Sequence, residues 1–260
     1  ENSQKFQALG KRTLEEAAKM ASAVDVRMLT QSRLATNITN GIIHAFKEYD
    51  ASEIIMGLHE KKTDGDKFWG IFTPDLVNQL NRQIILCRCN RPLNTLRRIL
   101  VAVPSRVEFE QGFYRWIERL ARLAENLSCR IIFHGRIEST SLINEYIRNQ
   151  HPGVRAEYVL MEHWKEFTQL AQQMSSDHML VVISARQGTV SYKPVFERLP
   201  LELYRHYHEH NLMVVFPDQN GQSPEDMTFT APQHHSVDSA YSSIVNWVMN
   251  KIDKGRSEAS

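Results

Sequence analysis

Residues 96–134 read LRRILVAVPSRVEFEQGFYRWIERLARLAENLSCRIIFH, and this stretch decides the fold class. The apolar run 99–103 is long enough for a buried strand and too short for a buried helix. Ser105 stands where a helix N-cap should, Glu108 follows at the capping-box distance, and apolar residues then recur at helical spacing. A second short apolar run occupies 129–133. The stretch therefore predicts a strand, a crossover helix and a second strand parallel to the first.

The bulk composition is that of a globular protein with one or two domains: 42% of the 260 residues are hydrophobic and 23% are charged. The 31 lysines and arginines nearly balance the 30 acids, so the net charge of +1 gives no electrostatic reason to expect nucleic acid as a partner. Three cysteines are too few for a disulfide scaffold or a zinc site, which fits a reducing compartment. No apolar run approaches the roughly 20 residues that span a bilayer.

Beyond residue 134 the predicted helices and strands simply alternate. We expect helices at 139–148, 164–174 and 195–207, and strands at 157–161, 179–183 and 212–216. With the two strands of the opening stretch, these elements make a five-stranded α/β domain over residues 94–218.

The first part of the chain, residues 1–93, repeats part of this order. We expect helices at 11–23, 37–47 and 75–82, and strands at 24–29, 52–58 and 84–87. Thr36 or Asn37 is expected to cap the second helix, and Thr73 with Pro74 to begin the third. Residues 52–88 match 178–216 at nearly equal spacing, so we interpret the two parts as copies of one fold.

The first copy shows three strands where the second shows five, so the chain is expected to open inside a domain, at its second helix. The domain boundary is placed near Pro92. Three strands that are apolar on both faces, 54–56, 99–103 and 181–183, are expected to lie centrally. Residues 219–260 form a C-terminal extension, in which a helix at 237–251 presents an apolar face to its own domains or to a partner.

Strands alternate with helices in both parts of the chain, and a glycine-bearing loop follows the fourth strand. The tandem arrangement resembles a pair of universal stress protein (UspA-like) domains. The resemblance implies an α/β fold with two tandem doubly wound parallel sheets, Rossmann-like, the first of them truncated at its N-terminal end. More narrowly, the tandem pair that begins mid-domain and ends in a polar extension resembles the cytoplasmic C-terminal region of bacterial monovalent cation/proton (sodium/hydrogen) antiporters.

The antiporter resemblance implies a non-catalytic regulatory or assembly module on the cytoplasmic side of the bacterial inner membrane. Its partners would be a membrane transport domain of the same polypeptide and a second copy in a homodimer. The alternative is a soluble tandem universal stress protein that binds adenine nucleotides. A doubly wound enzyme of flavodoxin type is a third hypothesis, for which the sequence offers no nucleophile or cofactor fingerprint.

Nucleotide-binding relatives carry G-x2-G-x9-G-[S/T] after the fourth strand, where glycines let backbone amides approach phosphates. In the first copy Gly57 and Gly70 take the first and last glycine positions, but Glu60 replaces the middle one and Ile71 the hydroxyl residue. A glutamate at that place repels phosphate.

In the second copy only Gly188 remains as a displaced glycine, beside Arg186, and Pro104 stands where an adenosine-binding aspartate belongs. The sequence therefore predicts that ATP binds weakly or not at all, with loops that merely connect strand to helix. The weak nucleotide-binding candidates are Gly57, His59, Gly70, Ser105, Arg186 and Gly188.

No metal site and no catalytic residue are predicted. Of His206, His208 and His210 only the first and last share a helix face, and the pair at 234–235 lies in a proline-bearing loop. Cys87 and Cys89 are two residues apart on a predicted strand, which favours packing of both in the core.

Overall fold

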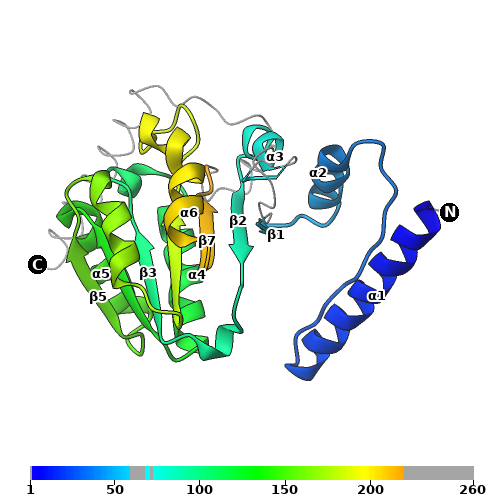
Figure 1. Ribbon diagram of the computed structural model, residues 1–260, viewed down its shortest axis with the longest axis horizontal. Helices are drawn as coiled ribbons and strands as arrows, with labels where there is room; N and C mark the ends of the chain where they lie inside the picture. The colour runs from blue at the N-terminus through cyan, green and yellow to red at the C-terminus, as the bar shows by residue number, and fades with distance from the viewer. Residues whose placement is uncertain (1, 59–67, 71–72, 220–260) are drawn as a thin grey trace, which may run out of the picture. The chain divides into compact units, whose positions relative to one another are not determined.

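The computed structural model describes residues 2–58, 68–70 and 73–219 (Figure 1). The chain divides into two compact units, Glu1–Ala45 and Phe46–Ser260. The C-terminal helix predicted at 237–251 lies outside the described residues, as do His59, Glu60 and Ile71. No described helix is both long enough and apolar enough to cross a bilayer.

The first unit is helical. It contains α1 (Asn2–Ala23) and the greater part of α2 (Ile38–Glu48). The backbone amide of Asn40 donates to the side-chain oxygen of Asn37 at 3.1 Å, so Asn37 caps α2 as predicted. The strand expected at 24–29 is absent, and the side chain of Val24 is 69% exposed. An alternating pattern forms a strand only when a neighbouring strand completes its hydrogen bonds, and no described strand does so here.

The second unit is built on one seven-stranded sheet in the order β1-β2-β7-β6-β3-β4-β5. Its strands are β1 (Glu53–Gly57), β2 (Gln83–Arg88), β3 (Arg98–Ala102), β4 (Arg130–Gly135), β5 (Ala156–Leu160), β6 (His178–Ile183) and β7 (Asn211–Phe216). Every neighbouring pair is parallel except β2 with β7, which is antiparallel. The expectation of two separate sheets is thus wrong for the described chain, because β2 and β7 join their strands into one sheet.

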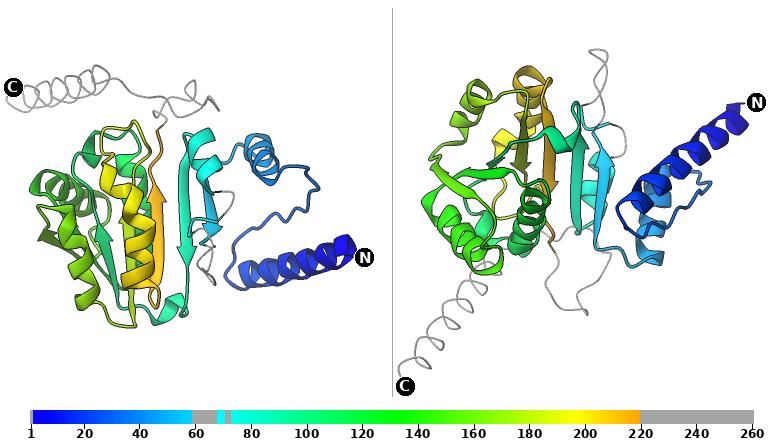
Figure 2. Two further views of the ribbon diagram at one scale, coloured as in Figure 1. Left: turned by 45° about the horizontal axis from the view of Figure 1, so that its top comes forward. Right: turned by 90° about the horizontal axis from the view of Figure 1, so that it is seen from below.

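Helices cover both faces of this sheet. α4 (Phe113–Asn126) and α6 (Leu199–Tyr207) lie on opposite faces (Figures 1 and 2), and α5 (Ile137–Gln150) packs beside α4. The remaining elements are α3 (Thr73–Gln79) and the 3₁₀ segments η1 (Leu93–Thr95), η2 (Val107–Phe109), η3 (Trp164–Gln173) and η4 (Pro194–Arg198). The helix expected at 164–174 is therefore 3₁₀, and the one expected at 195–207 is divided between η4 and α6.

The predicted capping box after β3 does not form. Arg106 adopts a left-handed conformation (φ 69°), the chain then makes η2, and α4 begins only at Phe113. The carboxylate of Glu108 instead accepts a hydrogen bond from the hydroxyl of Ser139 in α5 at 2.6 Å. Local spacing identified the helix correctly but placed its start too early.

The core lies between the sheet and its helices, with Trp116 of α4 fully buried among the side chains of β3, β4 and β6. The strands predicted at 99–103 and 181–183 are central, as expected, and Val181 is 0% exposed. The strand predicted at 54–56 is wrong as a central strand, since β1 ends the described sheet and Ile55 is 66% exposed. Cys87 is half-buried, but Cys89 is exposed beyond the end of β2, so its predicted core position is also wrong.

Candidate functional site

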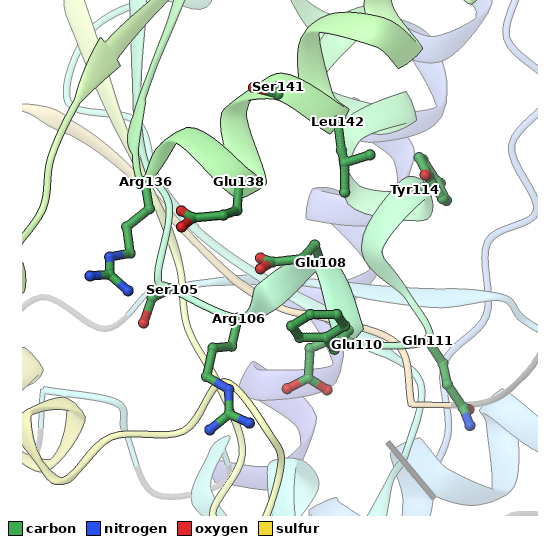
Figure 3. Close-up of a pocket in the computed structure, with 11 residues that line it drawn as sticks. Ser105, Arg106, Glu108, Glu110, Gln111, Tyr114, Arg136, Glu138, Ser141 and Leu142 are labelled. Atoms are coloured by element: carbon green, nitrogen blue, oxygen red, sulfur yellow. The ribbon is translucent and has the colours of Figure 1, made fainter. Parts of the chain in front are cut away.

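A pocket of about 650 Å³ opens at the carboxyl ends of β3 and β4 (Figure 3). Residues of the loop 105–111 and Tyr114 of α4 form one wall, and residues between Arg136 and Leu142 at the start of α5 form the other. Ser105 and Arg136 lie toward one end of the pocket, and Tyr114 and Leu142 toward the other (Figure 3). The pocket exists because the chain turns through η2 after β3 instead of entering α4 directly, which leaves space between this loop and α5.

Charges of both signs surround the pocket. Arg106 and Arg136 line the pocket. Burial lowers the pKa of Lys193, and the positive charges of Arg136 and Arg106 lower it further. Glu108, Glu110 and Glu138 line the same pocket. Two arginines, three carboxylates and the apolar side chains of the lining can hold a small amphiphilic molecule by its charged and apolar parts.

The loop after β6 is attached to this wall through Glu110. One carboxylate oxygen of Glu110 accepts hydrogen bonds from the amide and the hydroxyl of Ser191, at 3.0 and 2.6 Å. Both residues are buried, so the loop 105–111 is fixed to the loop that follows β6. The described residues contain no group of three side chains able to hold a metal ion.

Arg186 lies in the loop that follows β6. Its side chain is 3% exposed and donates to three backbone carbonyls: Val77 at 3.2 Å, Arg82 at 2.5 Å, and Pro217. Burial lowers its pKa to about 10, and the guanidinium lies 6.0 Å from the ring centroid of Phe216. Arg186 thus connects the loop after β6 with the segments that enter β2 and leave β7.

Asp218 fills the next position along this edge. It is 1% exposed and pairs with Arg115 of α4, and Nη1 of Arg82 lies 3.8 Å from its carboxylate. Gly112 packs so closely on the backbone of Asp218 that a β-carbon would have no room. The amide of Gln219 donates to the carbonyl of Asn81 at 2.7 Å. We call Arg186, Asp218, Arg82 and Arg115 the edge clasp.

No protein-family model matches this chain, and no curated protein matches it. Solved structures are similar in fold. A universal stress protein from Archaeoglobus fulgidus DSM 4304 gives a TM-score of 0.54 at 15% identity, covering 81% of this chain and 79% of that one. The fold is that of a universal stress protein. A functionally unknown protein from Pseudomonas aeruginosa PAO1, PA1789, gives a TM-score of 0.48 at 18% identity, covering 80% of this chain and 78% of that one.

Within this universal stress protein fold, the predicted nucleotide-binding residues do not form one group. Ser105 lines the pocket, and Arg186 belongs to the edge clasp at the same edge of the sheet. Gly57 ends β1 on the other side of the sheet from Ser105 and Arg186, where the amino ends of β3, β6 and β7 lie, because β1 and β2 run antiparallel to β7. Gly70 and Gly188 have φ angles of 75° and 89°, which glycine adopts without strain. His59 lies outside the described residues.

Sequence reasoning missed Arg106 and Arg136 in the pocket and Asp218 in the edge clasp. A signal for Arg136 was present, since it directly follows a buried strand, and ligands of parallel α/β sheets bind at the carboxyl ends of strands. The left-handed turn at Arg106 has no such signal, because arginine rarely adopts that conformation.

Proposed function

We propose that this chain is a non-catalytic regulatory module of a monovalent cation/proton antiporter of the sodium/hydrogen exchanger type. It would act on the cytoplasmic side of the bacterial inner membrane, attached to a transport domain that carries out the exchange. The observation that supports this proposal best is the edge clasp. The hydrogen-bonding capacity of Arg186 is directed to three backbone carbonyls, at the edge where a nucleotide-binding relative would hold phosphate.

An edge used in this way favours an assembly role over nucleotide chemistry. If the Arg186 guanidinium moved away to admit a ligand, three buried backbone carbonyls would lose their hydrogen-bond donors. This loss costs free energy and therefore opposes ligand binding at the edge clasp. The clasp also joins the segment before β2 to the end of β7, which makes the described part of Phe46–Ser260 one continuous platform. A domain whose segments are held together in this way moves as one body, which allows it to transmit a conformational change to an attached protein.

The alternative is a soluble tandem universal stress protein that binds adenine nucleotides, and one observation favours it. The 650 Å³ pocket beside Ser105 is open and carries two arginines. In the antiporter proposal the same pocket is available for a small regulatory molecule instead.

The complete reading frame tests the proposal. We expect it to encode about a dozen apolar segments of membrane-spanning length before this region, and its product to sediment with membranes after cell lysis. A reading frame that begins just before one further strand, with a product that remains in the supernatant, would support the soluble alternative.

We also propose that the module forms a homodimer, as its attachment to a dimeric transporter implies. Sedimentation of the chain at high micromolar concentration should give a dimer. If alanine at Ile244 and Trp247 abolishes the dimer and leaves the circular dichroism spectrum intact, the segment 237–251, for which the sequence predicts a helix, is at the interface. A monomer throughout this concentration range would contradict the proposal.

A further inference from the structure

Five charged side chains line the pocket beside Ser105. Two are positive and three are negative: Arg106 and Arg136 against Glu108, Glu110 and Glu138. No ion pair joins any two of these five residues, and Arg136 pairs instead with Glu162, which does not line the pocket. Charges of opposite sign that share a pocket without pairing are available to a ligand that carries both signs.

One end of the pocket can hold an anionic group. Ser105 and Arg136 lie toward this end (Figure 3). Of the donors of Arg136 only Nε is engaged by a described residue, Glu162 at 3.3 Å. Arg106, next to Ser105 in the chain, makes no hydrogen bond or ion pair with any residue that the structure describes. Ser105 is only 9% exposed, yet its hydroxyl has no partner in the described part of the chain. Because a guanidinium fork fits both oxygens of a carboxylate, this end suits a carboxylate.

The negative side chains differ in how far they are already engaged. Glu110 is 8% exposed, and one of its oxygens accepts two hydrogen bonds from Ser191, so it holds the two loops together. Glu108 accepts one hydrogen bond, from Ser139, and Glu138 has no partner among the described residues. In the view of Figure 3 the carboxylates of Glu108 and Glu138 lie between the two ends of the pocket. Two like charges in one pocket favour a cation beside both.

The other end of the pocket is apolar. Tyr114 and Leu142 lie toward it (Figure 3), and Phe109 also lines the pocket. The side chains of Phe109 and Tyr114 are each 38% exposed, so part of each ring is open to a ligand. Since aromatic rings stack on one another or meet edge to face, this end favours an aromatic group.

We propose that the pocket binds an α-amino acid with an aromatic side chain. The carboxylate of the ligand pairs with Arg106 and Arg136. Its ammonium group lies beside Glu108 and Glu138, and its ring occupies the apolar end. In an α-amino acid these three groups branch from one carbon atom, so one small molecule reaches all three parts of the pocket. The inference rests on the proposed function only in making this ligand the small regulatory molecule, because binding itself depends on the pocket alone.

The charge of the lining favours this class of ligand over a nucleotide. Three carboxylates and two guanidinium groups leave the lining with one excess negative charge. A phosphate group would add about two more negative charges, whereas a zwitterion adds none. Charge complementarity therefore opposes the nucleotide and admits the amino acid.

Calorimetry on the chain of 260 residues tests the proposal. We expect phenylalanine, tyrosine or tryptophan to bind with a dissociation constant of about 100 µM or tighter. Analogues of the tightest-binding amino acid that lack its carboxylate or its ammonium group should bind at least about 10-fold more weakly, because each leaves one set of charges without a partner. This measurement needs no transport domain, so its outcome is separable from that of the antiporter assignment.

Two variants assign the charged groups separately. Arg106→Gln should weaken binding of the amino acid and of its amine-free analogue by about 10-fold and leave the carboxylate-free analogue unaffected. Glu138→Gln should weaken binding of the amino acid and of its carboxylate-free analogue by about 10-fold and leave the amine-free analogue unaffected. Both side chains are exposed, so the circular dichroism spectrum should stay unchanged. Arg97→Gln is the matched control, because Arg97 precedes β3, at the end away from the pocket, and its side chain is 84% exposed.

Absence of binding by all three amino acids up to about 10 mM would overturn the proposal. Unchanged affinity in both Arg106→Gln and Glu138→Gln would overturn it too, since the ligand would then lie elsewhere. If adenosine monophosphate binds more tightly than the amino acids and loses affinity in Arg106→Gln, the pocket is a nucleotide site and the proposal is wrong.

Discussion

Replacing Arg186 by methionine should destabilise the protein strongly. The substitution keeps the length and apolar stem of the side chain but removes the donors to the carbonyls of Val77, Arg82 and Pro217. Each buried carbonyl without a donor costs about 1–3 kcal/mol. Because the desolvated charge of the arginine is removed at the same time, part of this cost is offset. We expect a net loss of about 3 kcal/mol in the free energy of unfolding.

Urea denaturation followed by circular dichroism and by tryptophan fluorescence measures this loss. With a slope of about 2 kcal/mol/M, a loss of about 3 kcal/mol lowers the midpoint by about 1.5 M. Arg186→Lys should lose about 2 kcal/mol, because lysine keeps the charge but not the planar fork that reaches three carbonyls. Arg97→Met is the control: that side chain is 84% exposed and should change stability by less than about 0.5 kcal/mol.

A shift of less than about 0.3 M for Arg186→Met, with an unchanged slope, would refute the reasoning. Water would then satisfy the three carbonyls, and the guanidinium would be available to an anionic ligand. The edge clasp would in that case be no argument against nucleotide binding.

Three further predictions concern charge, ligand and packing. Hydrogen bonds, chiefly from His151 at 2.6 Å, lower the pKa of Glu118 from 4.5 to about 2. The ionised carboxylate therefore stabilises the fold above pH 4.5, and this contribution to the free energy of unfolding is lost as the pH falls toward 2. The advantage of the unmutated protein over Glu118→Gln in urea should accordingly shrink below pH 4.5, and an advantage independent of pH would contradict this. Calorimetry with ATP should give a dissociation constant no tighter than about 1 mM, whereas a micromolar constant, equivalent to about 8 kcal/mol, would mean that the loops are misread. Gly112→Ala should lower the free energy of unfolding by about 2 kcal/mol, because its β-carbon meets the backbone of Asp218. The control Gly57→Ala has nothing within 4 Å of the added carbon and should cost less than about 0.5 kcal/mol. Equal losses of stability in the two variants would show that the backbone of Asp218 moves aside without cost.

The sequence predicted well those elements whose patterns are local. β3 and β6 are recognisable because strands buried on both faces are continuous apolar runs. α4 is recognisable because a helix buried on one face carries apolar residues at helical spacing. Asn37 was recognisable as a cap because a short polar side chain stands directly before the periodic residues of α2.

The arrangement of the two parts was not predictable in this way. The antiparallel contact centred on Leu86 and Val214 joins strands 128 positions apart, and nothing in either strand specifies its neighbour. The edge position of β1 follows from that contact, and so does the placement of Gly57 away from Arg186. The pattern at 24–29 has the alternation of a strand, but a strand also needs a partner, which sequence spacing does not supply.

The candidate site was predicted only in part. Ser105 was identified, but its predicted role as a helix cap was wrong, because the chain turns at Arg106 and α4 begins only at Phe113. Residues between them line the pocket instead. Arg186 was identified as a loop residue, yet its carbonyl partners come from α3, the approach to β2 and the end of β7. Contacts that converge from several distant segments leave no local pattern.

Cation-dependent proton exchange in everted membrane vesicles tests the central claim most directly. The comparison is between the complete protein and the same protein without this module, at matched levels in the membrane. We predict that exchange persists without the module, and that its pH profile shifts by roughly 0.7 pH unit or more, as a fivefold change in apparent proton affinity would produce. Superimposable pH profiles and rates for the two proteins would contradict a regulatory role, and absence of exchange by the complete protein would contradict the antiporter assignment itself.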